Sequence, residues 1–166
     1  MQPKMKPFLK EGLTEYAKAK NTVAAFEEQM VLLLKATLKG RERQKQGWPH
    51  LTNVKQGRPS PGGGSGGYGC WISVYISGKS QRHGDAGIDC GLWWDCPEPN
   101  ISEPIVYAEF WGKPKRLVEF PWDKNKKGIR HFVQSGRTCL YLPIPKSLEI
   151  ADPLNRLLDA LLEQLR

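Results

Sequence analysis

The sequence has no apolar run long enough to cross a membrane. Its longest, Met30–Leu34, has five residues, whereas a membrane-spanning helix needs about 20. The N-terminus is basic, with Lys4, Lys6 and Lys10, but the apolar core of a secretory signal does not follow it. We therefore expect a cytoplasmic protein that does not associate with a membrane. Apolar residues still make up 39% of the 166, with six Trp, five Tyr and five Phe, so a wholly disordered chain is excluded.

The chain is also poor in the residues of metal centres and disulfide scaffolds, with three His and four Cys. Cys70, Cys90 and Cys139 lie in apolar segments, where a free Cys behaves as a small hydrophobe. The closest pair, Cys90 and Cys96, is separated by five residues, which is wider than the usual spacing of a structural zinc site. We expect reduced thiols and no metal or other cofactor. Two disulfides and a zinc site are the alternatives.

Apolar side chains at alternating spacings of three and four predict a helix over residues 8–39. The stripe consists of Tyr16, Ala19, Val23, Phe26, Met30, Leu33 and Thr37. Pro7 suits the start of a helix and Gly40 the position just after its end. The helix would be about 48 Å long at 1.5 Å per residue, which exceeds the width of a domain of this size. Either it breaks near Asn21, or one end projects and finds a partner.

We expect this stripe to pack into the core. It lasts only about three heptads, and Lys18, Lys20 and Asn21 interrupt its first half. A homodimer formed by the N-terminal helix as a coiled coil is the alternative.

Residues 41–69 are predicted to form a surface loop or linker. Gly, Pro and Ser dominate residues 57–69, and both Gly and Pro oppose regular structure. Trp48–Leu51 is the only apolar anchor in this stretch.

Short segments rich in β-branched and aromatic residues follow, which is typical of strands. They are residues 70–77, 88–94, 105–111, 115–120, 129–134 and 138–143. Short connections favour antiparallel pairing, because a parallel crossover needs a dozen residues or more.

A second helix is predicted over residues 152–165, with Asp152 as N-cap and Pro153 in the first position. Its apolar stripe consists of Leu154, Leu157, Leu158, Leu161, Leu162 and Leu165. A long helix, a sheet of five or six mainly antiparallel strands over residues 70–143, and a closing helix make an α+β fold. We treat residues 1–166 as a single domain, with both helices against one face of the sheet.

The formal net charge of +8 is concentrated in two parts of the chain. Residues 1–60 have a net charge of +7 and residues 112–137 a net charge of +6, whereas residues 61–111 have −4. A domain that needs only solubility mixes its signs. This segregation therefore predicts an acidic partner.

The basic segment, residues 112–137, is the candidate binding site. The residues assigned to it are Lys113, Lys115, Arg116, Trp122, Lys124, Lys126, Lys127 and Arg130. Cations neutralise phosphates, and flat rings stack on unpaired bases. Nucleic acid is thus favoured slightly over an acidic protein surface. The alternative is a solubilising surface with Trp111 and Trp122 in the core.

A second candidate site lies among the acidic residues. Asp89 or Asp95 on one predicted strand, with Glu109 and Lys113 on the next, resembles in outline the D…E-x-K site of restriction-type nucleases. Here Lys follows Glu by four residues instead of two, so Trp111 takes the place that the motif gives to Lys. We expect these carboxylates to be solvated and not to converge.

The sequence therefore predicts a non-enzymatic binding domain for an acidic partner, slightly favouring nucleic acid. A protein-interaction or adaptor domain is the first alternative, and a metal-dependent nuclease is the second.

Overall fold

The computed structural model describes residues 7–43, 51–57, 68–76, 87–96, 98–112, 118–123 and 128–164. In order, the elements are α1 (Pro7–Arg43), β1 (Leu51–Gly57), β2 (Tyr68–Ile76), β3 (Gly87–Asp95), β4 (Ile105–Trp111), β5 (Arg130–Gln134), β6 (Arg137–Pro143) and α3 (Ala151–Glu163). None of the helices in these stretches combines the length and the apolar character that spanning a bilayer requires.

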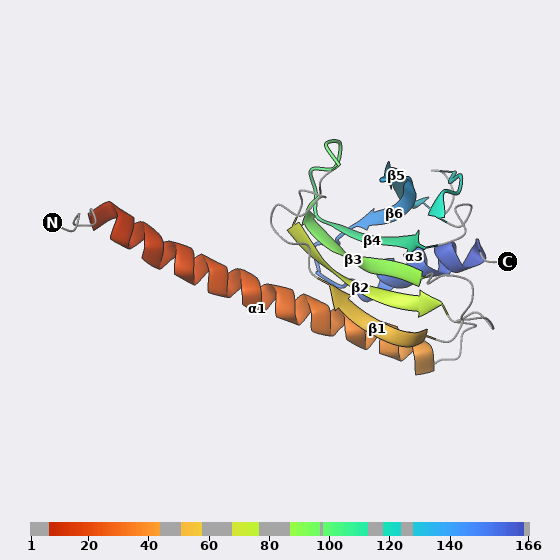
Figure 1. Ribbon diagram of the computed structural model, residues 1–166, viewed down its shortest axis with the longest axis horizontal. Coiled ribbons are helices and arrows are strands. Elements are labelled where there is room, and N and C mark those ends of the chain that lie inside the picture. Colours follow the sequence, from red (N-terminus) through yellow and green to blue (C-terminus); the bar gives the residue numbers. More distant parts are fainter. Residues whose placement is uncertain are drawn as a thin grey trace.

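The six strands form one antiparallel sheet in the order β1-β2-β3-β4-β6-β5 (Figure 1). Neighbouring strands in the sheet are consecutive among the described strands, except that β4 pairs with β6 and β5 lies at the edge beyond β6. β5 and β6 are joined by Ser135 and Gly136, whose φ angles of 51° and 74° are both positive, as in a type I′ hairpin turn. The predicted α+β fold with a mainly antiparallel sheet is confirmed.

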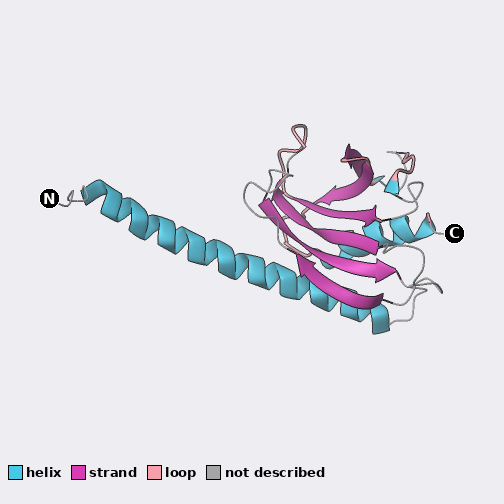
Figure 2. Ribbon diagram, viewed as in Figure 1, coloured by secondary structure: helices cyan, strands magenta, loops and turns pink. Residues whose placement is uncertain are grey.

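Both helices cover the same face of this sheet (Figure 2). α1 packs on β2, and α3 packs on β4 and β6. The side chains buried between the helices and the sheet are Val31, Leu34 and Leu38 of α1, Leu154, Leu157, Leu158 and Leu161 of α3, and alternate strand residues such as Ile72, Ile88, Leu92, Phe110 and Leu140. The core therefore lies between the sheet and the two helices.

α1 is one unbroken helix of 37 residues, about 55 Å long at 1.5 Å per residue. Of the two alternatives that the helix length left open, a break near Asn21 or a projecting end, the break does not occur. Thr22 Oγ1 donates to the carbonyl oxygen of Lys18 at 3.1 Å, so this side chain bonds within the helix. Gly40 lies inside the helix, not after its end. The N-terminal half projects from the rest of the molecule (Figure 1), and all residues from 11 to 26 are exposed.

Two strand predictions and one cap prediction are wrong. β1 lies within residues 41–69, where a loop was expected; it is an edge strand with two apolar residues, Leu51 and Val54, so its pattern gave no strand signal. The described part of the expected strand 115–120, residues 118–120, is not a strand. The N-cap of α3 is Ile150, with no side-chain bond, and Asp152 lies in the first turn, where its charge still favours the helix dipole.

Thr138 of β6 fastens residues 118–123 to the sheet. This side chain is 3% exposed, and its Oγ1 donates to the carbonyl oxygen of Phe120 at 2.8 Å and accepts from the Phe120 amide at 3.2 Å. The hydroxyl thus satisfies two buried backbone groups that no strand pairing serves.

Thr138→Val is expected to lower the free energy of unfolding by about 2 kcal/mol, because it keeps the shape but leaves both groups of Phe120 unsatisfied. Thr138→Ser, which keeps the hydroxyl, should cost less than half as much. Urea unfolding of the two variants measures the difference, and equal losses would show that the methyl group, not the hydroxyl, matters.

Candidate functional site

The sheet face opposite the helices, named here the open face, carries the candidate functional residues. Successive side chains of a strand point to opposite faces, so every second residue lies on it. Its members include Trp71 and Ser73 of β2, Asp89 and Trp93 of β3, Ile105, Tyr107 and Glu109 of β4, Arg130 and Phe132 of β5, and Arg137, Cys139 and Tyr141 of β6. Neither α1 nor α3 covers this face (Figure 2).

Aromatic side chains form two groups on the open face. Trp93 and Tyr107 are buried, with ring centroids 5.7 Å apart, and pack with Ile101 from the connection between β3 and β4. Phe132 and Tyr141, also with centroids 5.7 Å apart, are only half-buried at the β5–β6 edge. The connection between β3 and β4 therefore covers the part of the open face near these two strands. The aromatic rings at the β5–β6 edge stay partly accessible.

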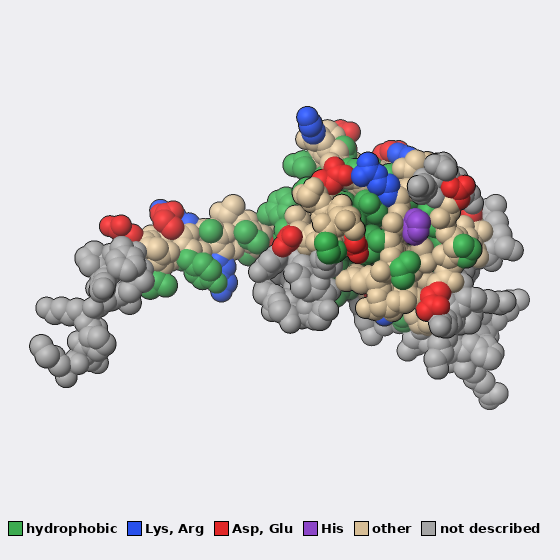
Figure 3. All heavy atoms as spheres, turned by 90° about the horizontal axis from the view of Figure 1, so that it is seen from above, with side chains coloured by type: hydrophobic (Ala, Val, Ile, Leu, Met, Phe, Trp, Pro, Cys, Tyr) green, Lys and Arg blue, Asp and Glu red, His purple; other side chains and the backbone are tan. Residues whose placement is uncertain are grey.

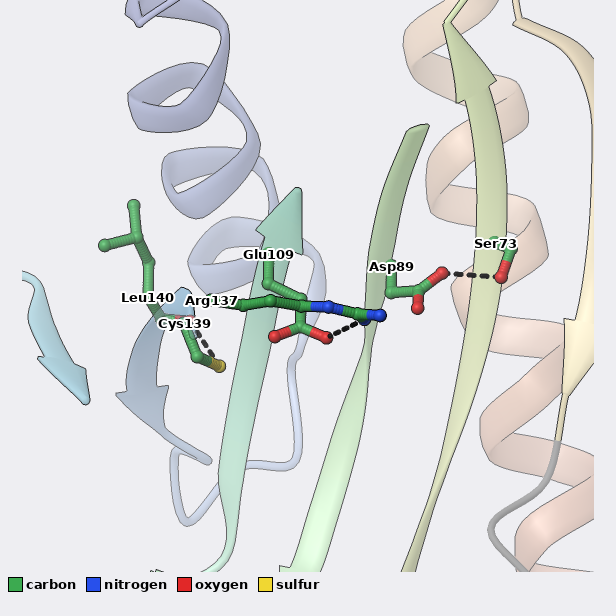
Figure 4. A network of polar contacts seen from close by, with 6 residues as sticks. All are labelled: Ser73, Asp89, Glu109, Arg137, Cys139 and Leu140. Atoms are coloured by element: carbon green, nitrogen blue, oxygen red, sulfur yellow. Dashed lines mark hydrogen bonds and ion pairs between the residues drawn. The ribbon is translucent and has the colours of Figure 1, made fainter. Parts of the chain in front are cut away.

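Three polar residues form a row across the centre of the open face (Figure 4). Ser73, Asp89 and Glu109 are direct register partners on β2, β3 and β4. The Ser73 hydroxyl donates to Asp89 Oδ1 at 2.5 Å. The strand register therefore places two carboxylates side by side, each on a rigid central strand.

Arg137 supplies the positive charge beside this row. Its Nη1 donates to Glu109 Oε1 at 3.2 Å, and its side chain is 41% exposed against 14% for Glu109. The same guanidinium also favours the ionised form of Asp89, although burial has the larger effect and raises the pKa of that carboxyl group. The Arg137 guanidinium therefore interacts electrostatically with both carboxylates. We name Asp89, Glu109 and Arg137 the charged cluster; its net charge is −1 when both acids are ionised.

Burial changes the protonation of this cluster. Burial, followed by repulsion from Asp89, raises the pKa of Glu109 from 4.5 to about 7, although Arg137 opposes the change. Burial also raises the pKa of Asp89, against the Ser73 hydrogen bond and Arg137. Because a buried carboxyl group disfavours its charged form, Glu109 is partly protonated near neutral pH and the cluster is then close to neutral.

The expectation that the carboxylates do not converge is wrong for Asp89 and Glu109. Opposite residues of an antiparallel pair have Cβ atoms roughly 5 Å apart, and the two carboxylates interact electrostatically. Asp95 is exposed at the end of β3, in register with Tyr68, and is not part of the cluster. Lys113 lies outside the described residues, so the resemblance to a nuclease site stays untested on that side.

Glu109 forms an ion pair with Arg137, and Asp89 accepts a hydrogen bond from Ser73. Among the described residues no group of three or more His, Cys, Asp or Glu side chains lies close enough to hold a metal ion. Metal-dependent nucleases bring two or three carboxylates onto their cations, and here a guanidinium stands between the two acids (Figure 4).

None of the four cysteines forms a disulfide, and Cys70, Cys90 and Cys139 are buried in strands, as their apolar surroundings in the sequence predict. Burial raises the pKa of Cys90 to about 12 and that of Cys139 well above its ordinary value. Because the thiolate is the nucleophile, these two side chains are unsuited to nucleophilic catalysis.

Most of the sequence-predicted binding residues lie outside the described residues: Lys113, Lys115, Arg116, Lys124, Lys126 and Lys127. Of the other two, Trp122 is 7% exposed, and its indole N–H donates to the carbonyl oxygen of Ile129 at 3.2 Å. A ring in this position presents no face for a base, so we leave it out of the candidate surface. Arg130 is 58% exposed and pairs with Glu103 at 2.9 Å.

Sequence reasoning missed Arg137 as the partner of Glu109 and Ser73 as the partner of Asp89. A signal was present for Arg137, because it directly follows the two turn residues Ser135 and Gly136 and so begins a strand. Its neighbour on the next strand depends on the register, which no local pattern fixes. Compared with protein-family models, curated proteins and solved structures, the chain has no match.

Proposed function

We propose that this protein is a non-enzymatic binding domain for an acidic partner, and that single-stranded nucleic acid is the favoured partner. The observation that carries the proposal is the composition of the β5–β6 edge of the open face. Arg130 lies opposite Tyr141 in the register, and Phe132 is the next residue of β5 on that face. One cation and two partly accessible rings thus share a small area.

This combination suits an unpaired strand. Successive bases stack on aromatic side chains while cations contact the backbone, and the sequence of the bases matters little. The exposed Arg130–Glu103 pair is no obstacle, because exposed ion pairs contribute at most about 1 kcal/mol and exchange partners readily.

The sequence on either side of these residues adds to the positive charge. Residues 112–137 contain eight basic and two acidic side chains, and they include β5, its turn and the start of β6. The charged cluster does not oppose an anionic partner strongly, because Arg137 supplies one positive charge against the two carboxylates and the raised pKa of Glu109 reduces the negative charge of that residue near neutral pH.

The salt dependence of binding tests this proposal. If about six phosphates are neutralised, log K should fall with log salt concentration at a slope near −4 for a single strand and near −5 for a duplex. Fluorescence anisotropy with labelled 20-mer oligonucleotides at several salt concentrations gives both slopes. Single strands should bind more tightly, since only their bases can stack on Phe132 and Tyr141.

A triple variant separates the basic segment from the general charge of the protein. Replacing Lys124, Lys126 and Lys127 by Ala should flatten the slope by about two to three. The matched control replaces Lys18, Lys35 and Lys146, which are exposed in the described residues and lie elsewhere, and should change it far less. Equal effects of the two variants, or no binding at low salt, would contradict the proposal, and the latter would favour the adaptor alternative.

A further inference from the structure

The projecting half of α1 carries an apolar surface that the described part of the chain leaves largely exposed; only at its inner end does Phe26 contact Trp94 of β3, with ring centroids 5.3 Å apart. Leu13, Tyr16, Val23 and Phe26 are 56%, 66%, 49% and 39% exposed. Hydrophobic side chains are visible along the projecting helix in Figure 3. An isolated helix in water is only marginally stable, and most helices in proteins depend on packing of an apolar face.

This apolar surface continues the face that packs in the core. Eighteen residues make five turns of an α-helix at 3.6 residues per turn. Leu13 therefore lies on the same side of α1 as Val31, and Tyr16 on the same side as Leu34, both of which are buried against the sheet and α3. Among the described residues, one face of the helix thus packs against the core over its C-terminal half and is largely exposed over its N-terminal half.

The charge of this half excludes the partner proposed for the open face. Residues 7–29 contain three basic and four acidic side chains, whereas the whole protein has a net charge of +8. This half therefore has no excess of positive charge that could neutralise the phosphates of a nucleic acid. A second copy of the same segment meets almost no net repulsion.

We propose that the protein forms a homodimer in which the projecting halves of α1 from two copies pack side by side in antiparallel orientation. The position of the sheet decides the orientation. It sits at the C-terminal end of α1 (Figure 1), on the side of the helix that carries the apolar stripe. Parallel helices would bring both sheets to the same place, whereas antiparallel helices keep them at opposite ends.

Side-chain volumes support this orientation. Tyr16 and Val23 occupy one position of a heptad repeat, and Gly12, Ala19 and Phe26 occupy the other. When the helices are antiparallel about a centre between residues 17 and 18, Tyr16 faces Ala19 of the partner subunit and Val23 faces Gly12 of the partner subunit. Tyr16 and Val23 then each meet a small residue, which gives close packing without overlap at the centre of the contact.

The size of the contact predicts a reversible dimer. Covering the four exposed apolar side chains in two copies buries on the order of 1,000 Å² in total, since an aromatic residue alone can bury roughly 150–250 Å². This is near the lower limit for a specific interface. We therefore expect dissociation in the micromolar concentration range.

Light scattering and sedimentation equilibrium between roughly 1 and 100 µM test the dimer. The wild-type mass should rise toward twice the 18.8 kDa of one chain. Tyr16→Glu with Val23→Glu should hold the mass at one chain, while the matched control, Asn21→Glu with Ala25→Glu on the opposite side of the helix, should still dimerise. A wild-type protein that stays at 18.8 kDa, or a control that dissociates equally, would overturn the proposal.

Cysteine cross-linking tests the orientation without relying on charged variants. In a Cys96→Ser background, because the other three cysteines are buried, Gly12→Cys and Val23→Cys should cross-link two chains only when both are present. In a parallel dimer each position faces itself, so Val23→Cys alone would cross-link. That result would refute the antiparallel arrangement, and the absence of any cross-link in the double variant would refute the contact itself.

Discussion

Gly91→Ala is expected to lower the free energy of unfolding by at least ~3 kcal/mol, enough to lower the melting temperature by roughly 10 °C in a protein of this size. Gly91 lies in the central strand β3, between Trp71 of β2 and Tyr107 of β4. A methyl group there would overlap the carbonyl oxygen of Cys70 and lie 2.7 Å from Trp71 Cα. These are backbone atoms of a strand held on both sides, so they cannot move away cheaply.

The control for this prediction is Gly40→Ala. A methyl group at Gly40 meets no atom within 4 Å, and the residue lies inside a helix, where Ala is more stable than Gly by up to about 1 kcal/mol. The same substitution should therefore destabilise at one position and stabilise at the other, as thermal unfolding can measure. A loss below 1 kcal/mol for Gly91→Ala would mean that β2 and β3 pair less closely than described.

Glu109→Gln is expected to raise the free energy of unfolding by about 3 kcal/mol at pH 8 and to change it little at pH 4.5. The folded state holds the Glu109 proton up to a pKa of about 7, while the unfolded chain releases it near 4.5. Between these values the folded state binds more protons, so rising pH favours unfolding. The loss in the wild type between pH 4.5 and 8 should total about 3 kcal/mol, and Gln abolishes it.

Urea unfolding at pH 4.5, 6 and 8 measures this difference, because the contributions of other groups cancel between wild type and variant. Glu103→Gln is the matched control. Its carboxylate is 48% exposed and pairs with exposed Arg130, so we expect a change below about 0.5 kcal/mol at every pH. A wild-type protein whose stability relative to Glu109→Gln does not change with pH would show that Glu109 titrates as a solvated carboxylate.

Most of the fold could be predicted because its buried segments are distinctly apolar in sequence. The apolar runs of β2, β3, β4 and β6 and the leucines of α3 carry clear strand and helix periods. β1 could not be predicted in this way, since an edge strand of seven residues with two apolar side chains is stabilised by backbone bonds to β2. The apolar pattern of α1 predicted a helix but not which half of it packs against the sheet, because Leu13 and Val31 are equivalent apolar positions in that pattern.

The candidate site was less predictable because it depends on register. Asp89 and Glu109 were recognised as a possible pair, but the position of each relative to the other follows from the pairing of β3 with β4. A shift of one residue would send Glu109 into the apolar core. The basic segment was recognised from composition alone. Composition cannot predict that Trp122 is buried, with its indole N–H bonded to the carbonyl oxygen of Ile129.

Helix α3 also determines when the chain can complete its fold during synthesis. Every strand is made before α3, yet α3 contributes Leu154, Leu157, Leu158 and Leu161 to the core, each fully buried. Until these residues leave the ribosome, the side of β4 and β6 that they cover remains open to water and to other nascent chains. Domains fold as units once enough of the chain is available. Folding of this protein is therefore expected to finish only after α3 has been made. Until then, the sheet and α1 are expected to be only partly packed.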